Sequence, residues 1–288
     1  MQDTVAEAIS HLTDRHFRRI AELIETQVGI KLPEAKRLMI EGRLHKRVRA
    51  LGCRNLNEYV ESLFDNPNFD AELVHLIDCV TTNKTDFFRE PSHFDFMRKV
   101  AVPEIIERRN GGVPLLKIWS AACSTGVEAY TVAMVLDDMN RTGSRFHFRI
   151  LGTDISTSVL RAAQTGIYTR EMIAPVPEEM ARRYFLSAKD RSRADVRVVP
   201  ELRRLAAFQR MNLMDATYPI DRDVDIIFCR NVLIYFDKPT QRKVVDQLCT
   251  HLRPGGYLMV GHSESMVHNG SKALKQIQPT IFQLENRS

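Results

Sequence analysis

The sequence LLKIWSAACSTGVEAYTVAM occupies residues 115–134 and links an apolar run to a second segment through a short loop. Residues 115–122 are mostly apolar and bulky, which predicts a buried strand. Residues 124–126 (Ser-Thr-Gly) then form a loop, and residues 127–140 predict a helix. A strand that leads directly into a helix is the unit from which parallel sheets are built. The segment therefore predicts an α/β fold.

The same alternation continues toward the C-terminus. Further strands are predicted at 148–156, 206–213, 224–231 and 257–264, with a terminal strand at 277–285. Helices are predicted around 159–163 and 240–252, the second stopped by Pro254-Gly255-Gly256. The alternation lapses between 174 and 204, in an arginine-rich stretch that is interpreted as an insertion.

The first 80 residues lack strand patterns and predict a small all-α domain. Apolar residues at helical spacing from Phe17 to Val28 predict one helix, which Gly29 ends. A second helix follows Pro33 and ends at Gly52, and two short helices are expected at 56–64 and 69–79. The surface of the second helix carries basic side chains: Lys36, Arg43, Lys46, Arg47 and Arg49.

Composition excludes several classes of protein. Of the 288 residues, 44% are hydrophobic and 27% charged, which suits a globular protein and excludes long disorder. No apolar run is long enough to cross a bilayer, and the first residues do not resemble a signal peptide, so the expected location is the cytoplasm. Five scattered cysteines without a CxxC pair argue against a disulfide framework or a cysteine-based zinc site.

The net charge of +5 is unevenly distributed. Residues 31–54 carry a local charge of +6 and residues 180–204 a local charge of +5, so the remainder is mildly acidic. Two basic patches on an acidic body predict docking on localised anionic surfaces. The alternative is that the basic helix is simply a solvated face.

Polar residues cluster where the predicted strands end, at 120–126, 153–154, 212–213 and 229–231. In open parallel sheets such residues converge on one ligand crevice. Asp154 is placed to accept hydrogen bonds from the ribose hydroxyls of an adenosine. The alternative is that Asp154 caps the helix that follows at Ser156.

The loop after the first strand indicates which nucleotide binds. A dinucleotide fold requires G-x-G-x-x-G, but this loop contains Gly126 alone, and the phosphate-binding pattern GxxxxGK[ST] is absent. A loop with one glycine, followed by Glu128 and then Asp154, favours a positively charged adenosine with an amino-acid tail. This description fits S-adenosylmethionine (SAM).

Six sequence blocks carry more specific information than the spacing of apolar residues. They are TTNKTDFFRE (81–90), IWSAACSTGVEAYTVAM (118–134), TDIS (153–156), NL (212–213), IFCRNVLIYFDK (227–238) and LRPGGYLMVGHSES (252–265). Together with FRRIAELIETQVGIKL (17–32) and KRLMIEGRLHKRVRALG (36–52), they closely resemble the chemotaxis-receptor methyltransferase family, CheR. The resemblance covers nearly the whole chain.

The resemblance implies SAM-dependent O-methylation of glutamate side chains on chemoreceptors, which yields glutamate methyl esters and S-adenosylhomocysteine. A glutamate is already ionised at neutral pH, so the site needs alignment and desolvation more than acid–base help, and no metal is expected. The implied catalytic residues are Arg89, Arg230 and Tyr235. The implied cofactor-binding residues are Asn83, Thr85, Arg89, Glu128, Asp154, Asn212, Leu213, Arg230 and Asn231.

The resemblance also implies a domain organisation: an all-α domain at 1–80, a linker at 81–114 that contributes to the cofactor site, and a Rossmann-like methyltransferase domain at 115–288. The insertion at about 174–204 corresponds to a small antiparallel β subdomain, which in some members binds a pentapeptide at the receptor C-terminus. Here the segment 187–195 has no glycine, unlike in those members. The basic helix is expected to dock on acidic receptor helices.

Two other readings compete with this one. A nucleic-acid methyltransferase often carries [DN]PP[YF] after its fourth strand, but residues 229–232 are Cys-Arg-Asn-Val. Residues 31–54 also lack the aromatic side chains that stack on bases. We therefore expect no nucleic-acid partner and no membrane insertion. A non-catalytic receptor-binding module is disfavoured because Arg89, Arg230 and Tyr235 are all present.

Overall fold

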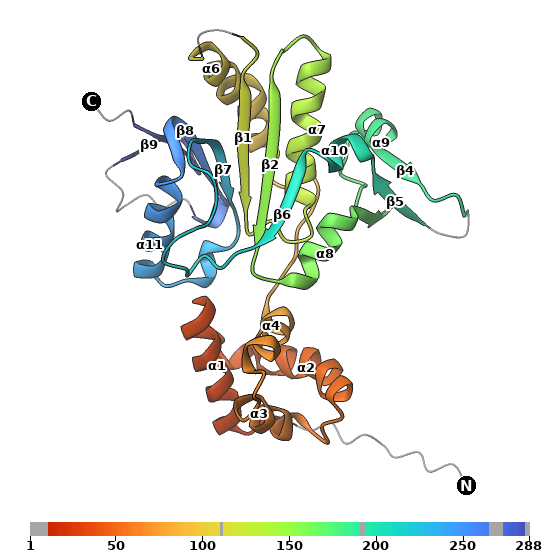
Figure 1. The fold of residues 1–288 in the computed structure, drawn as a ribbon, viewed down its shortest axis with the longest axis vertical. Helices are drawn as coiled ribbons and strands as arrows, with labels where there is room; N and C mark the ends of the chain where they lie inside the picture. The colour runs from red at the N-terminus through yellow and green to blue at the C-terminus, as the bar shows by residue number, and fades with distance from the viewer. Residues whose placement is uncertain (1–10, 110–111, 191–193, 265–272, 286–288) are drawn as a thin grey trace. The chain divides into compact units, whose positions relative to one another are not determined.

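The computed structural model describes residues 11–109, 112–190, 194–264 and 273–285. The chain divides into two compact units, Met1–Thr82 and Asn83–Ser288 (Figure 1). No helix in these described ranges combines the length and the apolarity that a membrane crossing requires.

Unit 1 is helical throughout its described part. Its helices are α1 (Asp14–Val28), α2 (Arg37–Leu51), α3 (Leu56–Phe64) and α4 (Phe69–Val80), with a 3-10 turn η1 (Glu34–Lys36) before α2. The Thr13 side chain caps α1 by accepting a hydrogen bond from the His16 N–H, and Gly29 ends the helix with φ of 72°. The expected all-α domain is confirmed.

Unit 2 is built on a seven-stranded sheet with the order β6-β2-β1-β7-β8-β10-β9. The strands are β1 (Leu115–Ala121), β2 (His147–Asp154), β6 (Ala206–Arg210), β7 (Val224–Cys229), β8 (Leu252–Val260), β9 (Leu274–Gln278) and β10 (Ile281–Leu284). Neighbours from β6 to β8 are parallel, whereas β10 is antiparallel to β8 and to β9. All six residues of β7 are buried, as expected for a central parallel strand covered on both faces.

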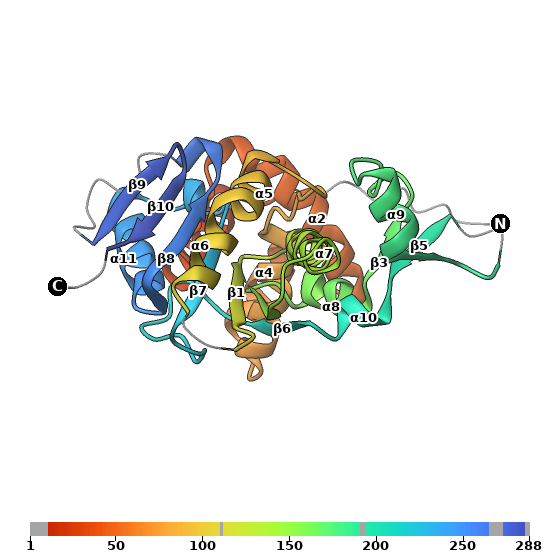
Figure 2. The ribbon, with the colours of Figure 1, turned by 90° about the horizontal axis from the view of Figure 1, so that it is seen from above.

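Helices cover both faces of this sheet. The helices of unit 2 are α5 (Ser92–Phe96), α6 (Val102–Glu107), α7 (Val127–Arg141), α8 (Thr157–Thr165), α9 (Glu178–Tyr184), α10 (Pro200–Arg203) and α11 (Lys238–Cys249), of which α9 packs on the small sheet described below. A π-helical turn η2 (Met97–Ala101) joins α5 to α6, and 3-10 turns occur at η3 (Leu233–Tyr235) and η4 (His262–Glu264). Figure 2 shows α5, α6 and α7 over one face and α11 over the other. This arrangement follows from right-handed crossovers, because β1 to β2 and β7 to β8 step in opposite directions.

Four sequence expectations for this sheet need correction. The strand expected at 257–264 begins at Leu252 and ends at Val260, before η4. The strand expected at 206–213 ends at Arg210, and the single terminal strand expected at 277–285 is a hairpin of β9 and β10. Pro254-Gly255-Gly256 does not stop α11, because this helix ends at Cys249 and all three residues lie within β8. A Cβ on Gly256 would lie 2.9 Å from two backbone oxygens, so the glycine here permits close backbone approach inside a strand.

Residues 81–114 form more than a connection. Within this range α5, η2 and α6 place Phe94, Phe96 and Met97 in the hydrophobic core of unit 2. Phe94 stacks on Phe228 of β7 and Phe96 meets Tyr257 of β8 edge-on, which explains why the contact boundary lies at the start of this segment.

A second, three-stranded antiparallel sheet lies beside α7 and α8 (Figure 1). It consists of β3 (Ile167–Thr169), β4 (Phe185–Ser187) and β5 (Asp195–Val198), in the order β3-β5-β4. The expected small antiparallel sheet is therefore present, but it begins at Ile167, ahead of the expected start near 174, because β3 supplies one edge. Residues 191–193 of the glycine-free segment lie outside the described residues.

Candidate functional site

Three strand ends lie at the same level in the main sheet. Ala121, the last residue of β1, is opposite Thr153 of β2 on one side and opposite Cys229 of β7 on the other. The residues that follow each strand therefore leave the sheet at one edge. Asp154 and Arg230 both emerge there, as the sequence predicted.

Asp154 is buried and organises the loop that follows β1. Its Oδ2 accepts a hydrogen bond from the Ser124 N–H at 2.8 Å, and its Oδ1 accepts one from the Ser156 N–H at 2.9 Å. Ser156 is itself the residue whose side chain caps α8. Asp154 therefore supports the cap of α8 only indirectly, by accepting a hydrogen bond from the backbone N–H of Ser156. Because each carboxylate oxygen has two lone pairs, Asp154 can still accept hydrogen bonds from ligand hydroxyls.

Arg230 lies at the centre of the site with only 3% of its side chain exposed. Its Nη1 donates to Glu128 Oε2 at 3.1 Å, and its Nη2 lies 3.1 Å from Glu90 Oε2. Nη2 also donates to the backbone carbonyl of Arg89. We call Arg230, Glu128 and Glu90 the Arg230 cluster. It joins the end of β7 to the start of α7 and to the segment before α5.

The two carboxylates of the Arg230 cluster differ electrostatically. Burial raises the pKa of Glu128, although Arg230 and the Ser120 hydroxyl, which donates to Glu128 Oε1 at 2.6 Å, oppose the rise. Burial also acts to raise the pKa of Glu90, but Arg230 and the hydrogen bonds from the His262 N–H and Asn231 hold it below its usual value. The guanidinium is therefore required to keep two buried acids close together.

Glu264 is a functional candidate that sequence reasoning missed. Its Oε2 accepts from the Asn231 N–H at 2.9 Å and the Gly261 N–H at 2.6 Å, and its Oε1 accepts from the Ile234 N–H at 3.2 Å. This buried carboxylate fixes the loop after β7. Glu90 was also missed, because the residues that form hydrogen bonds with its carboxylate, Arg230, Asn231 and His262, lie more than 100 residues away in the sequence.

Backbone strain marks the same region. Five of the seven non-glycine residues with positive φ in the described chain lie here: Phe88, Glu90, Ala122, Ser124 and Asn231. Such conformations are costly and cluster at functional sites. Two of these residues, Phe88 and Glu90, flank Arg89.

The remaining predicted site residues lie on the segments around this edge. The Asn83 carbonyl accepts a hydrogen bond from the Ser124 hydroxyl at 2.8 Å, and Thr85 follows on the same half-buried segment. Asn212 Oδ1 accepts from the Met214 N–H at 3.0 Å, and the Leu213 carbonyl accepts from Tyr218. Tyr235 is half-buried at the end of η3.

The predicted docking residues belong to unit 1 and fall into two groups. Arg43 donates to the Thr81 carbonyl at 2.7 Å, and Arg47 forms a two-point pair with Glu72 at 2.9 and 2.5 Å. These two arginines hold unit 1 together. The others, Lys36, Lys46 and Arg49, are half-buried (Lys36) or exposed.

Comparison with known proteins decides the family. Residues 83–282 match the model described as the SAM binding domain of CheR methyltransferase, and residues 15–81 match its all-alpha domain. The chain belongs to the CheR methyltransferase family. It is 36% identical over 274 residues to a chemotaxis protein methyltransferase of Borreliella burgdorferi, covering 94% of this chain and 95% of the relative. The corresponding proteins of Klebsiella aerogenes and Escherichia coli are 40% and 38% identical, covering 88% and 89% of this chain and 84% and 86% of theirs.

Membership in the CheR family confirms the predicted fold and makes the chain a SAM-dependent methyltransferase of chemotaxis. The residues present fit this cofactor. Asp154 and Glu128 offer acceptor oxygens at the ends of neighbouring elements, as hydroxyl and ammonium groups require. Gly126 has φ of 80°, and a Cβ there would lie 2.7 Å from Ala163 Cβ. The loop can therefore adopt this backbone conformation only with glycine at position 126.

Proposed function

We propose that this CheR methyltransferase transfers the methyl group of SAM to glutamate side chains of the cytoplasmic helical region of chemoreceptors. The products are glutamate methyl esters and S-adenosylhomocysteine. The observation that carries the proposal is the Arg230 cluster, which holds Glu128 and the backbone of Arg89 at the edge where Asp154 emerges. The chemotaxis methyltransferase relatives support the receptor as substrate.

The cofactor roles follow from these positions. Asp154 would accept hydrogen bonds from the ribose hydroxyls, and Glu128 would meet the methionine or ribose portion. Asn212 and Leu213 would line the adenine. Asn83 and Thr85 would close over the ligand from the segment tied to Ser124, while Arg89, Arg230 and Asn231 would border the methionine end.

When bound, SAM supplies a methyl group on a sulfonium, which the glutamate oxygen attacks as the carbon–sulfur bond breaks and its electron pair stays on sulfur. The substrate carboxylate is already ionised at neutral pH, so no residue has to remove a proton. The chain has to align the two reactants and exclude water. Arg89 would orient the substrate carboxylate, because a guanidinium binds it at two points. Arg230 would act as a positioning residue, because it binds the Arg89 carbonyl and both acids of the cluster. Tyr235 would border the methyl group.

The direct experiment incubates the purified protein with tritiated SAM and membranes that contain chemoreceptors. Base-labile label on the receptor supports the proposal, because methyl esters hydrolyse readily in base. Label found only on RNA or DNA contradicts it and favours the nucleic-acid alternative.

Replacing Arg89 with alanine should lower kcat for receptor methylation by about 100-fold, the cost of losing an orienting charge at the reacting centre. The fold should persist, because the described side-chain hydrogen bond of Arg89 is a single 3.3 Å contact to the Lys84 carbonyl. Methylation kinetics and circular dichroism test this result. Wild-type kcat in Arg89→Ala would remove Arg89 from the site.

Neutralising Lys46 and Arg49 should lower the rate of receptor methylation several-fold at low salt and flatten its salt dependence, because exposed charges act mainly on encounter. The matched control is glutamine at Arg242 and Lys243, which removes the same charge from exposed positions on α11. An unchanged salt response in the Lys46/Arg49 variant would make the basic helix a solvated face only.

We also propose the small sheet as the place where a receptor C-terminal peptide binds by adding a strand. A pocket of 370 Å³ lies over β4 and β5, bordered by the exposed side chains of Ile167 and Leu186. Tethering at this place would raise the local concentration of the receptor without changing the chemical site. Pull-down with receptor fragments that keep or lack their last five residues tests it, and equal capture of both contradicts it.

A further inference from the structure

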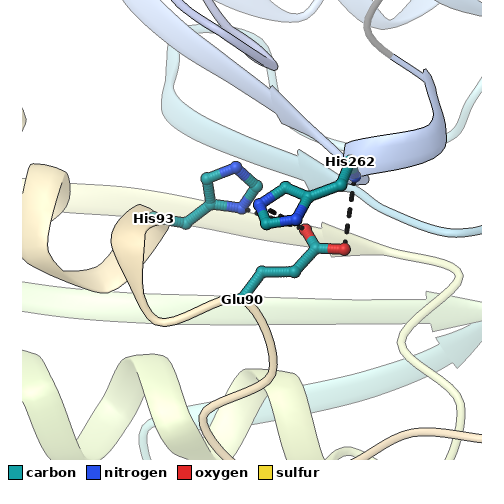
Figure 3. Close-up of side chains that lie close together, drawn as sticks. All are labelled: Glu90, His93 and His262. Atoms are coloured by element: carbon teal, nitrogen blue, oxygen red, sulfur yellow. Dashed lines mark hydrogen bonds and ion pairs between the residues drawn. The ribbon is translucent and has the colours of Figure 1, made fainter.

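Three side chains with metal-ligating atoms converge beside the Arg230 cluster: Glu90, His93 and His262 (Figure 3). They come from the segment before α5, from α5 and from η4. His93 Nδ1 lies 3.6 Å and His262 Nε2 lies 3.9 Å from the same oxygen, Glu90 Oε2. All three candidate ligand atoms lie within 4.8 Å of one another.

His93 presents a bare nitrogen to this cluster. The ring is 1% exposed, and its Nε2 lies 2.8 Å from the Thr280 hydroxyl. That hydroxyl donates its proton to the Pro279 carbonyl, so it must accept a hydrogen bond from the Nε2–H of His93. In the neutral ring Nδ1 then carries a lone pair, and it has no hydrogen-bond partner among the described residues.

The lone pair of Nδ1 faces the Glu90 carboxylate, which is also an acceptor. A buried acceptor without a partner costs free energy. A cation bound between the two acceptors would satisfy the lone pairs of both.

The support behind His93 is typical of a metal ligand. Metal-bound histidines usually donate their other ring N–H to a fixed acceptor, which sets the tautomer and the ring orientation. Here the acceptor is Thr280, a buried residue with φ of 65° between β9 and β10. The strained backbone of Thr280 therefore holds the hydroxyl that leaves Nδ1 free for a ligand.

We propose that Glu90, His93 and His262 bind a divalent cation of the zinc class. Two imidazoles and a carboxylate are a common donor set for this class. Ligand distances near 2.0–2.2 Å place tetrahedral ligand atoms about 3.4 Å apart. The two histidine nitrogens lie 3.6 and 3.9 Å from Glu90 Oε2, so small side-chain movements would reach this geometry. His262, with 60% of its side chain exposed, can adjust and leaves a fourth position open to water.

The position of this site predicts inhibition of methyl transfer, a consequence that rests on the proposed function. The oxygen that would bind the cation, Glu90 Oε2, is the one that lies 3.1 Å from Arg230 Nη2. A bound cation would compete with Arg230 for Glu90 and loosen the cluster that positions Glu128. The cation would act on this cluster and would take no part in methyl transfer itself.

The test measures Zn²⁺ binding to the full chain by isothermal titration calorimetry, with Mg²⁺ as the hard-cation control. We expect Zn²⁺ to bind and Mg²⁺ not to bind. His262→Gln should weaken Zn²⁺ binding at least about 10- to 100-fold, because even outer partners of a metal ligand have effects of that size. The matched control is His147→Gln, an exposed histidine at the start of β2, which should bind Zn²⁺ like the wild type.

Equal Zn²⁺ affinity in the wild type and His262→Gln, or no binding to the wild type, would overturn the metal site. Co²⁺ provides a second readout, because a tetrahedral site gives visible absorption that His262→Gln should lose. In receptor methylation assays, Zn²⁺ should inhibit the wild type and inhibit His262→Gln much less. Loss of Zn²⁺ binding in His262→Gln without any receptor methylation by the wild type would leave the metal site standing and refute the proposed function.

Discussion

Replacing Arg230 with methionine should lower receptor methylation by more than about 1000-fold and destabilise unit 2 by about 3–5 kcal/mol. Arg230 is almost completely buried and binds both Glu90 and Glu128. Methionine fills similar space but leaves two buried carboxylates without their cation. Both acids would then repel each other or take up protons, and the segment that carries Arg89 would lose its anchor.

Methylation kinetics and urea unfolding measure the two effects. The methylation rate and the stability of Arg230→Lys should lie between those of the wild type and Arg230→Met. Lysine keeps the charge but lacks the planar guanidinium that can donate to two carboxylates and a carbonyl. Arg242→Met, an exposed arginine on α11, is the matched control and should change neither quantity. Wild-type kinetics and stability in Arg230→Met would show that the cluster has no role.

The sequence predicted the parts of this site that depend on local patterns. The strand, loop and helix around residues 115–140 have apolar spacing and turn residues that act within a few positions, and the structure places β1 and α7 there. Asp154 was predicted because a polar residue at the end of a strand marks the ligand edge in this class of fold.

The partners of Arg230 could not be predicted in this way. Glu90 lies 140 residues from Arg230, and the two meet only because the segment before α5 reaches the end of β7. The same applies to His93 and Thr280, whose contact spans 187 residues. These contacts depend on the topology of the whole sheet, which periodicity does not encode.

The hairpin of β9 and β10 shows a different limit. Alternating apolar and polar residues at 277–285 fit one strand, and they fit equally well the end of one strand and the whole of the next. The turn at Pro279-Thr280 requires φ of 65° at a threonine, a conformation that β-branched residues rarely adopt. Sequence rules therefore place no turn there.

Replacing Arg47 with methionine should destabilise unit 1 by about 3–5 kcal/mol, the usual cost of removing one partner from a buried ion pair. Glu72 is 4% exposed and receives two hydrogen bonds from Arg47 and one from the buried Tyr59. Amide hydrogen exchange of α2 and α4 in the full chain reports the loss. Arg49→Met, an exposed neighbour on α2, should leave the exchange unchanged.

The pH dependence of the contribution of Glu72 to the stability of unit 1 should change sign in Arg47→Met. In the wild type, burial acts to raise the pKa of Glu72, but Arg47 and Tyr59 hold it below the usual value. This ionised group therefore contributes stability that is present at neutral pH and is lost as the pH falls below about 4. Without Arg47, burial dominates and the pKa of Glu72 exceeds its unfolded value, so acidification should stabilise the variant.

A double variant separates the ion pair from the helix packing. Arg47→Met with Glu72→Gln removes both charges and keeps an amide oxygen that can accept the Tyr59 hydroxyl. Because replacing both members of a buried pair is often neutral, this variant should recover most of the protection lost in Arg47→Met. If the double variant exchanged as fast as Arg47→Met, the loss would come from packing of the arginine stem, and Glu72 would not depend on its charge partner.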